Sequence, residues 1–210
     1  MSVSSQLKQP PKYVTDLIAF YSPPRKDFSN RFYEMKEQKV LQDQVALRYY
    51  YFAGPHEDLS HPHHNNKRGL ADLAIFYETI NPEADLDEIA LRYYQQFVGA
   101  SWDEFGESVW MGSWELLYVR PDGRKGDIVS EFTALEDLDN LSNMLELTPD
   151  YEEDYEKSKQ YLAAAYDDPE VSQLRIYQIG DAGGGDVMEG RLILGCRRNG
   201  EMTILALIDD

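Results

Sequence analysis

The stretch that decides the fold is GRLILGCRRNGEMTILALI, residues 190–208. It holds two apolar runs of strand length, 191–196 and 202–208, separated by polar residues that include Asn199-Gly200. Asn-Gly between apolar runs is a strong β-hairpin signal, because both residues tolerate the positive φ angles of a tight turn. A third apolar run, 174–179, precedes them. We therefore predict three strands that close this part of the chain.

The segment before these strands predicts a hairpin and two helices. Residues 114–119 are rich in β-formers, Pro121-Asp122-Gly123 has turn chemistry, and 127–132 is the expected return strand. Helix starts follow at Thr133-x-x-Glu136, a capping pattern, and at Thr148-Pro149, a capping hydroxyl before proline at the first helical position. The predicted order is ββααβββ, a mostly antiparallel sheet with helices on one face.

The first half of the chain shows helical spacing of apolar residues. Two such sets stop at Gly54-Pro55 and Asn81-Pro82, and a third helix begins with Asp85-x-x-Glu88 and ends at Gly99. The two sets are Leu41, Val45, Tyr49 and Phe52, and Leu70, Leu73, Ala74 and Tyr77. The overall prediction is an α+β fold, with a helical region (1–105) packed on a sheet domain (106–210), or both regions forming one compact unit.

One short sequence occurs almost twice in the first half. Residues 43–50 read DQVALRYY and residues 87–94 read DEIALRYY. Two copies over eight positions are too few for a repeat architecture. Two similar core-facing helices or an old duplication would explain the pair.

The charge balance indicates what kind of partner the protein would bind. The 210 residues carry 38 acidic and 20 basic side chains, a formal net charge of -18. Nucleic acid and anionic membranes require a cationic face, so the balance favours a basic protein partner, although an acidic surface also serves solubility alone. Thirteen of the carboxylates lie in residues 128–170, against two lysines. From this run and the chain end, the predicted partner-binding residues are Glu131, Glu136, Asp137, Asp139, Glu152, Glu153, Asp154, Glu156, Asp209 and Asp210.

Other conspicuous residues have simpler explanations. All four histidines lie in a loop-like segment, and they are weak metal-ligand candidates because the fixed spacing of a metal-binding helix is missing: His56, His61, His63 and His64. Cys196 lies in an apolar run, which predicts a buried thiol. The glycine-rich residues 180–186 read as a connection between strands, since Asp186 would repel a phosphate. We recognise no catalytic motif and expect no cofactor, so enzyme activity is uncertain and less favoured than binding.

The chain's start lacks the apolar core of a signal peptide, and its apolar stretches are too short for a membrane span. With a single cysteine, we expect a reducing, cytoplasmic location.

The second half of the chain resembles the nuclease A inhibitor family of cyanobacteria. The resemblance lies in residues 175–180, 190–195 and 199–206, preceded by an acidic helix that ends in Asp167-Asp168-Pro169. It implies a small acidic α/β protein that plugs the metal-bearing site of a nuclease, with Asp209 and Asp210 at the corresponding chain end. The final residues 206–210 depart from the family's usual ending, and the first half has no counterpart in it.

These observations support an inhibitor or immunity-like protein that binds a basic partner, such as a nuclease, through its acidic run. The alternative is an interaction or scaffold module that uses the aromatic first half, around Tyr49, Tyr50, Tyr93, Tyr94 and Trp102. A third reading is a metal-dependent enzyme that uses the histidine loop. Trp102, Trp110 and Trp114 with Phe105 form either an exposed binding patch or a seam between helices and sheet.

Overall fold

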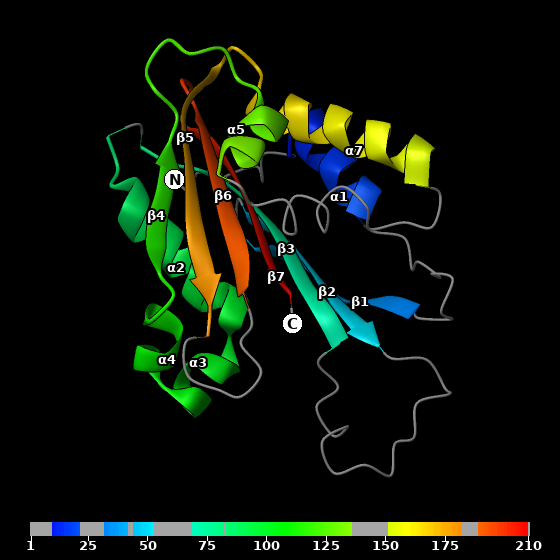
Figure 1. The fold of residues 1–210 in the computed structure, drawn as a ribbon, viewed down its shortest axis with the longest axis vertical. Coiled ribbons are helices and arrows are strands. Elements are labelled where there is room, and N and C mark those ends of the chain that lie inside the picture. Colours follow the sequence, from blue (N-terminus) through cyan, green and yellow to red (C-terminus); the bar gives the residue numbers. More distant parts are fainter. Residues whose placement is uncertain are drawn as a thin grey trace, which may run out of the picture.

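The strands form one antiparallel sheet. In the computed structural model, residues 10–21, 32–41, 44–52, 69–81, 83–135, 151–181 and 189–209 are described. The sheet order is β1-β2-β3-β7-β6-β5-β4, and every described pairing is antiparallel (Figure 1). The strands are β1 (Phe32–Leu41), β2 (Gln44–Phe52), β3 (Gly69–Thr79), β4 (Glu115–Val119), β5 (Val171–Gly180), β6 (Glu189–Arg197) and β7 (Glu201–Asp209).

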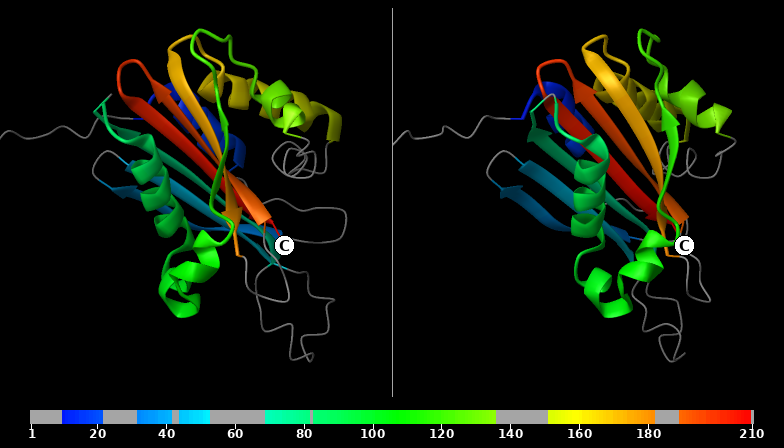
Figure 2. Two further views of the ribbon diagram at one scale, coloured as in Figure 1. Left: turned by 60° about the vertical axis from the view of Figure 1, so that its left-hand side comes forward. Right: turned by 90° about the vertical axis from the view of Figure 1, so that its left-hand side faces the viewer.

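Helices cover both faces of the sheet (Figures 1 and 2). One face packs against α1 (Lys12–Tyr21), α5 (Ile128–Ala134) and α7 (Tyr151–Tyr166). The other packs against α2 (Leu86–Val98) and α4 (Glu107–Met111), with α3 (Ala100–Phe105) between them. Because side chains alternate along a strand, β6 sends Ile193 to the first core and Leu192 and Leu194 to the second. Burial on both faces explains why the strand reads as a continuous apolar run.

The structure confirms an α+β fold with a mostly antiparallel sheet and confirms the three closing strands. β6 and β7 pair from Glu189–Asp209 to Cys196–Met202. Gly200 has a φ of 82°, the positive φ angle that the predicted Asn199-Gly200 turn requires. Helix α2 begins where predicted, since the Asp85 side chain accepts hydrogen bonds from the backbone N–H groups of Asp87 and Glu88.

The helices predicted in the first half at 41–52 and 70–77 are wrong, because these residues lie in β1, β2 and β3. In β3, Ala74 and Phe76 join one core while Ile75 and Tyr77 join the other, the two-residue period of a strand. A continuous apolar run fits a strand buried on both faces as well as it fits a helix. The helical description of residues 1–105 therefore holds only for α1, α2 and α3 among the described residues.

The predicted return strand at 127–132 is also wrong. Asp127 caps helix α5, with its side chain accepting a hydrogen bond from the Ser130 N–H at 3.0 Å. Thr133, expected to start a helix, lies inside α5 and donates its hydroxyl to the Val129 carbonyl. Thr148-Pro149 lies outside the described residues. β4 pairs instead with β5, and the helices lie on both faces of the sheet rather than one.

The sheet joins the two regions of the chain that the sequence separates near residue 105. β3 pairs with β7 from Ala71–Asp209 to Thr79–Glu201, and α2 packs on side chains of β5, β6 and β7. The boundary itself falls between α3 and α4. Both regions thus contribute to the same two cores.

Candidate functional site

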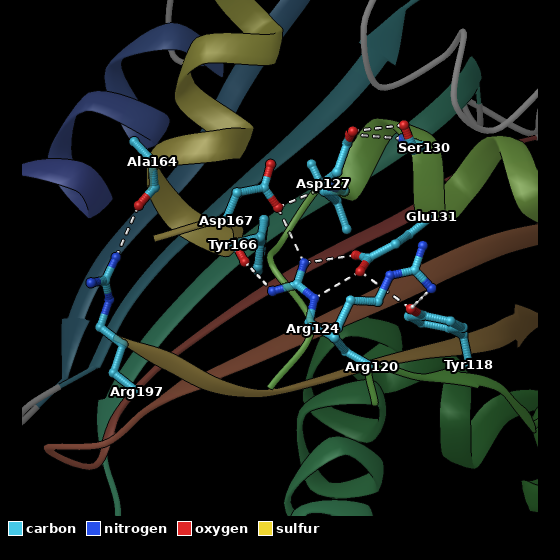
Figure 3. A network of polar contacts seen from close by, with 11 residues as sticks. Tyr118, Arg120, Arg124, Asp127, Ser130, Glu131, Ala164, Tyr166, Asp167 and Arg197 are labelled. Atoms are coloured by element: carbon cyan, nitrogen blue, oxygen red, sulfur yellow. Dashed lines mark hydrogen bonds and ion pairs between the residues drawn. The ribbon is translucent and has the colours of Figure 1, made fainter. Parts of the chain in front are cut away.

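Glu131, the first member of the predicted acidic run, is buried rather than exposed. Only 1% of this residue is accessible, and its carboxylate accepts hydrogen bonds from Arg120 Nε at 2.8 Å and Arg120 Nη2 at 2.7 Å (Figure 3). The Tyr118 hydroxyl donates to the same carboxylate at 3.2 Å. A carboxylate inside a bidentate ion pair is not available to a partner, so Glu131 is removed from the predicted binding surface.

The Arg120 ion pair ties β4 to α5 and α7. Arg120 Nη1 donates to the Tyr166 carbonyl at 2.6 Å, and Nη2 also reaches Asp167 Oδ1 at 3.1 Å (Figure 3). Asp167 accepts the backbone N–H of Ile128 at the first residue of α5. Burial raises the pKa of Asp167 to about 6, and the Glu131 charge adds to this, despite Arg120 and the Ile128 N–H. This cluster stabilises the fold and leaves little free charge.

The other described carboxylates of the predicted run are paired as well. Glu156 lies 3.4 Å from Lys159, Asp168 lies 3.3 Å from Arg197, and Glu170 lies 3.5 Å from Arg198. Glu152, Glu153 and Asp154 are in the first turn of α7, where the structure describes the backbone but not the side chains. Asp209 is the last residue of β7, likewise without a described side chain; Glu136, Asp137, Asp139 and Asp210 lie outside the described residues.

A second acidic surface, not singled out from the sequence, lies over helices α2 to α4. Residues 83–115 contain eight carboxylates and one cation, Arg92, which pairs with Glu78. Six of the eight are exposed and make no ion pair or hydrogen bond through their carboxylates with any described residue. One is Glu83, which precedes α2, and the other five lie in or after the helices: Glu88, Asp103, Glu104, Glu107 and Glu115. We call these five the α2–α4 acidic surface. Its carboxylates are unpaired among the described residues, whereas the described carboxylates of the predicted run all take part in ion pairs.

Two glycines shape this acidic surface. Gly99 ends α2 and Gly106 ends α3, with φ angles of 64° and 90° that favour glycine. The chain therefore turns twice within a few residues, and α3 and α4 are short helices at one end of α2 (Figure 2). The turns place Asp103, Glu104 and Glu107 on consecutive short helices.

The tryptophans form a seam between the helices and the sheet rather than an exposed patch. Trp114 stacks on Tyr177 of β5 at 4.7 Å and on Tyr94 of α2 at 5.5 Å between ring centroids. Trp110 is buried, and its indole N–H donates to the Ser101 carbonyl. Phe105 differs, because 47% of it is accessible beside Asp103, Glu104 and Glu107.

The edge strand β4 adds two more exposed apolar side chains. Leu116 is 41% and Val119 is 49% accessible, and with Phe105 they are the large exposed apolar residues of the described chain. Leu116 pairs with Tyr177 and Val119 with Arg175 across β5. Paired residues point to the same face, so Leu116 and Val119 lie on the face that α2 covers. Arg175 hydrogen-bonds Asp87 of α2, which holds the pKa of Asp87 below its usual value.

The structure describes only some of the aromatic side chains that the alternative function, an interaction or scaffold module, would use. Tyr93 and Tyr94 are fully buried, and the Tyr94 hydroxyl donates to the Gly180 carbonyl at 2.8 Å, with the Trp110 carbonyl a second acceptor within reach at 3.1 Å. Burial raises the pKa of Tyr94 well above its usual value. These two side chains are core residues and are closed to a partner. Tyr49 and Tyr50 lie in β2 without described side chains.

The described residues offer no metal centre or membrane helix. No group of three or more His, Cys, Asp or Glu among them is placed to hold a metal ion, and His56, His61, His63 and His64 lie outside them. Cys196 is buried, as predicted, and burial raises the pKa of its thiol. Of the helices described, none has both the length and the apolar character to cross a bilayer.

Comparison of the chain with protein-family models, with curated proteins and with solved structures found no match.

Proposed function

We propose that the chain is an acidic binding protein that neutralises a basic protein partner in the cytoplasm, in the manner of an inhibitor or immunity protein. The observation that supports this most directly is the α2–α4 acidic surface, whose carboxylates are exposed and unpaired among the described residues. Unpaired charge attracts an opposite charge at long range and raises the rate of encounter. Carboxylates already paired within the fold contribute much less.

Apolar side chains beside the acidic surface supply the affinity that a stable complex needs and that charge alone does not provide. Exposed ion pairs contribute little affinity in salt solution, so a stable complex also needs apolar contact. Phe105, Leu116 and Val119 are exposed on or next to the same face. A nuclease as the partner rests on the resemblance in residues 107–210 and remains a prediction.

Affinity capture from the native host at low ionic strength, followed by binding kinetics with the captured protein, tests this function. We expect a basic partner whose activity is lost at equimolar amounts of this chain. The association rate should fall at least about tenfold between 50 mM and 500 mM salt, because the Debye length shrinks from over 10 Å to a few ångströms.

Charge reversal locates the binding surface. The triple variant Asp103→Lys, Glu104→Lys and Glu107→Lys should slow association at least about tenfold, since it reverses the field at the α2–α4 acidic surface. The matched control reverses three exposed carboxylates elsewhere, Asp122→Lys, Glu156→Lys and Glu170→Lys, with the same change in net charge. An acidic partner, binding indifferent to salt, or equal effects of the two triple variants would contradict the proposal.

A further inference from the structure

β4 is an edge strand that lacks the usual protection of such strands. It pairs with β5, and the other side of its backbone has no strand partner among the described residues. Edge strands are commonly blocked by lysine, by proline or by inward-pointing charge. β4 reads ELLYV, with one charge at its first residue, and its protection is limited to its short length and an irregularity between Leu116 and Tyr118.

The side chains at this edge form an apolar ledge. Leu116 and Val119 point to the same face of the sheet and are about half exposed. An added strand would place every second side chain over this ledge, so that its apolar residues cover Leu116 and Val119. The edge therefore offers an apolar contact together with backbone groups that have no strand partner in the described part of the chain.

Charge around β4 is divided between its two ends. Glu115 begins the strand, and Glu104 and Glu107 of the α2–α4 acidic surface precede it. The loop after the strand's other end carries no net charge, because exposed Arg124 and Lys125 are balanced by exposed Asp122 and Asp127. A strand that adds in antiparallel orientation, as all the described neighbours do, would bring its C-terminal part to the acidic end. Basic residues are thus favoured in the C-terminal part of the added segment over its N-terminal part, because only the end of β4 near Glu115 carries a net charge.

We infer that β4 is the docking edge for an extended segment of a partner protein, apolar at alternate positions and basic toward its C-terminus, which adds to the sheet as an antiparallel strand. The inference rests on the proposed function for the partner's basic character and names how that partner is held. A second copy of this chain is a poorer occupant, because each copy carries a formal net charge of -18.

The test uses the full chain and synthetic nine-residue peptides. The first set alternates threonine with one apolar residue (Val, Leu, Ile or Phe) and has lysines in place of threonines in its C-terminal half. A second set has the same composition with the lysines in its N-terminal half. A third repeats the first with N-methyl groups on alternate backbone nitrogens, which removes the donors that face β4 and keeps the charge.

We expect at least one peptide of the first set to bind and to slow hydrogen exchange in residues 115–119 by about fivefold or more. Its counterpart in the second set and its N-methylated form should each bind at least about tenfold more weakly. Leu116→Lys and Val119→Lys, both at exposed positions, should weaken binding by a similar factor without lowering the melting temperature. The Asp122→Lys variant serves as a surface control.

The outcomes separate this inference from the proposed function. Salt-dependent binding that N-methylation and the ledge variants leave unchanged would overturn strand addition, while the acidic surface would stand. If peptides of the first and second sets added as strands equally well, the claim that the bound segment is basic toward its C-terminus would be overturned. Failure of every peptide, or a dimer in sedimentation that the Val119→Lys variant abolishes, would also overturn the inference.

Discussion

Replacing Glu131 with methionine tests the central ion pair of the fold most directly. Methionine is close to glutamate in length but has no charge, so Glu131→Met leaves Arg120 buried without its bidentate partner. The two side chains are 4% and 0% accessible, so water does not take over the lost hydrogen bonds without opening the fold. Arg120 directly follows β4, so loss of the ion pair also removes a contact that holds this end of the proposed docking edge.

The expected cost follows from what Arg120 loses and keeps. It loses two hydrogen bonds, of 2.8 Å and 2.7 Å, and keeps the Tyr166 carbonyl at 2.6 Å and Asp167 at 3.1 Å. Breaking a buried ion pair by removing one partner costs roughly 3–5 kcal/mol, and the remaining contacts put this case at the lower end, about 3 kcal/mol. The double variant Arg120→Met with Glu131→Met removes both charges, so it should be more stable than Glu131→Met alone.

Urea unfolding followed by circular dichroism measures these differences. The midpoint should fall in Glu131→Met while the slope of the unfolding free energy against urea stays unchanged. In the double-mutant cycle, the sum of the unfolding free energies lost in the two single variants should exceed the free energy lost in the double variant. A cost below about 1 kcal/mol for Glu131→Met, or single costs that simply add, would refute a coupled buried pair at this site.

Three further changes test other parts of the structure. The pKa of Asp167, raised from 3.8 to about 6, means that its share of stability is complete below pH 3.8 and is lost as pH rises through 6. Asp167→Asn should therefore flatten the fall in unfolding free energy between pH 4 and 6 in urea titrations, and a slope equal to wild type would contradict this. Asp85→Ala removes the N-cap of α2 and should cost about 1 kcal/mol in the same assay, whereas Asp85→Asn, which still caps, should cost much less. Gly190→Ala would place a Cβ atom 2.0 Å from the Leu207 carbonyl oxygen, so we expect a cost of at least about 2 kcal/mol. Gly123→Ala, with nothing within 4 Å but a φ of 74°, should cost less in thermal melts, and the reverse order would contradict the packing of β6 on β7.

The closing strands were predictable because every local signal agrees. Apolar residues fill both runs and Asn199-Gly200 supplies the turn, so the hairpin of β6 and β7 needs no distant information to be recognised. The start of α2 was predictable for the same reason, since Asp85 provides a cap that the following apolar positions support.

The strands of the first half were not predictable, and one pentapeptide shows why. ALRYY occurs at 46–50 in β2 and at 90–94 in α2. The second copy follows the cap at Asp85, whereas the first continues into Tyr51 and Phe52, which favour a strand. Identical residues thus adopt both structures, because their neighbours and the sheet decide the outcome.

The binding surface could be predicted only in part. A count of carboxylates indicates that the chain is acidic, but it does not distinguish Glu131, which is buried in an ion pair, from Glu107, which is exposed. The excess of eight carboxylates over one cation in residues 83–115 was a usable signal for the α2–α4 acidic surface. The exposure of Leu116 and Val119 depends on β4 lying at the sheet edge, which only the pairing order reveals.

The position of β7 affects the order in which this protein can fold during synthesis. β7 lies inside the sheet between β3 and β6, yet the ribosome makes it after every other described strand. Until β7 emerges, β3 lacks the strand that pairs with it on that side. The two strands are far apart in the sequence, and long-range pairing of this kind is slow. The nascent chain therefore exposes one edge and the apolar faces of β3 from about residue 79 until β7 is made, a state prone to aggregation. We therefore expect the protein to depend on chaperones during translation until β7, the central strand of the sheet, has been made.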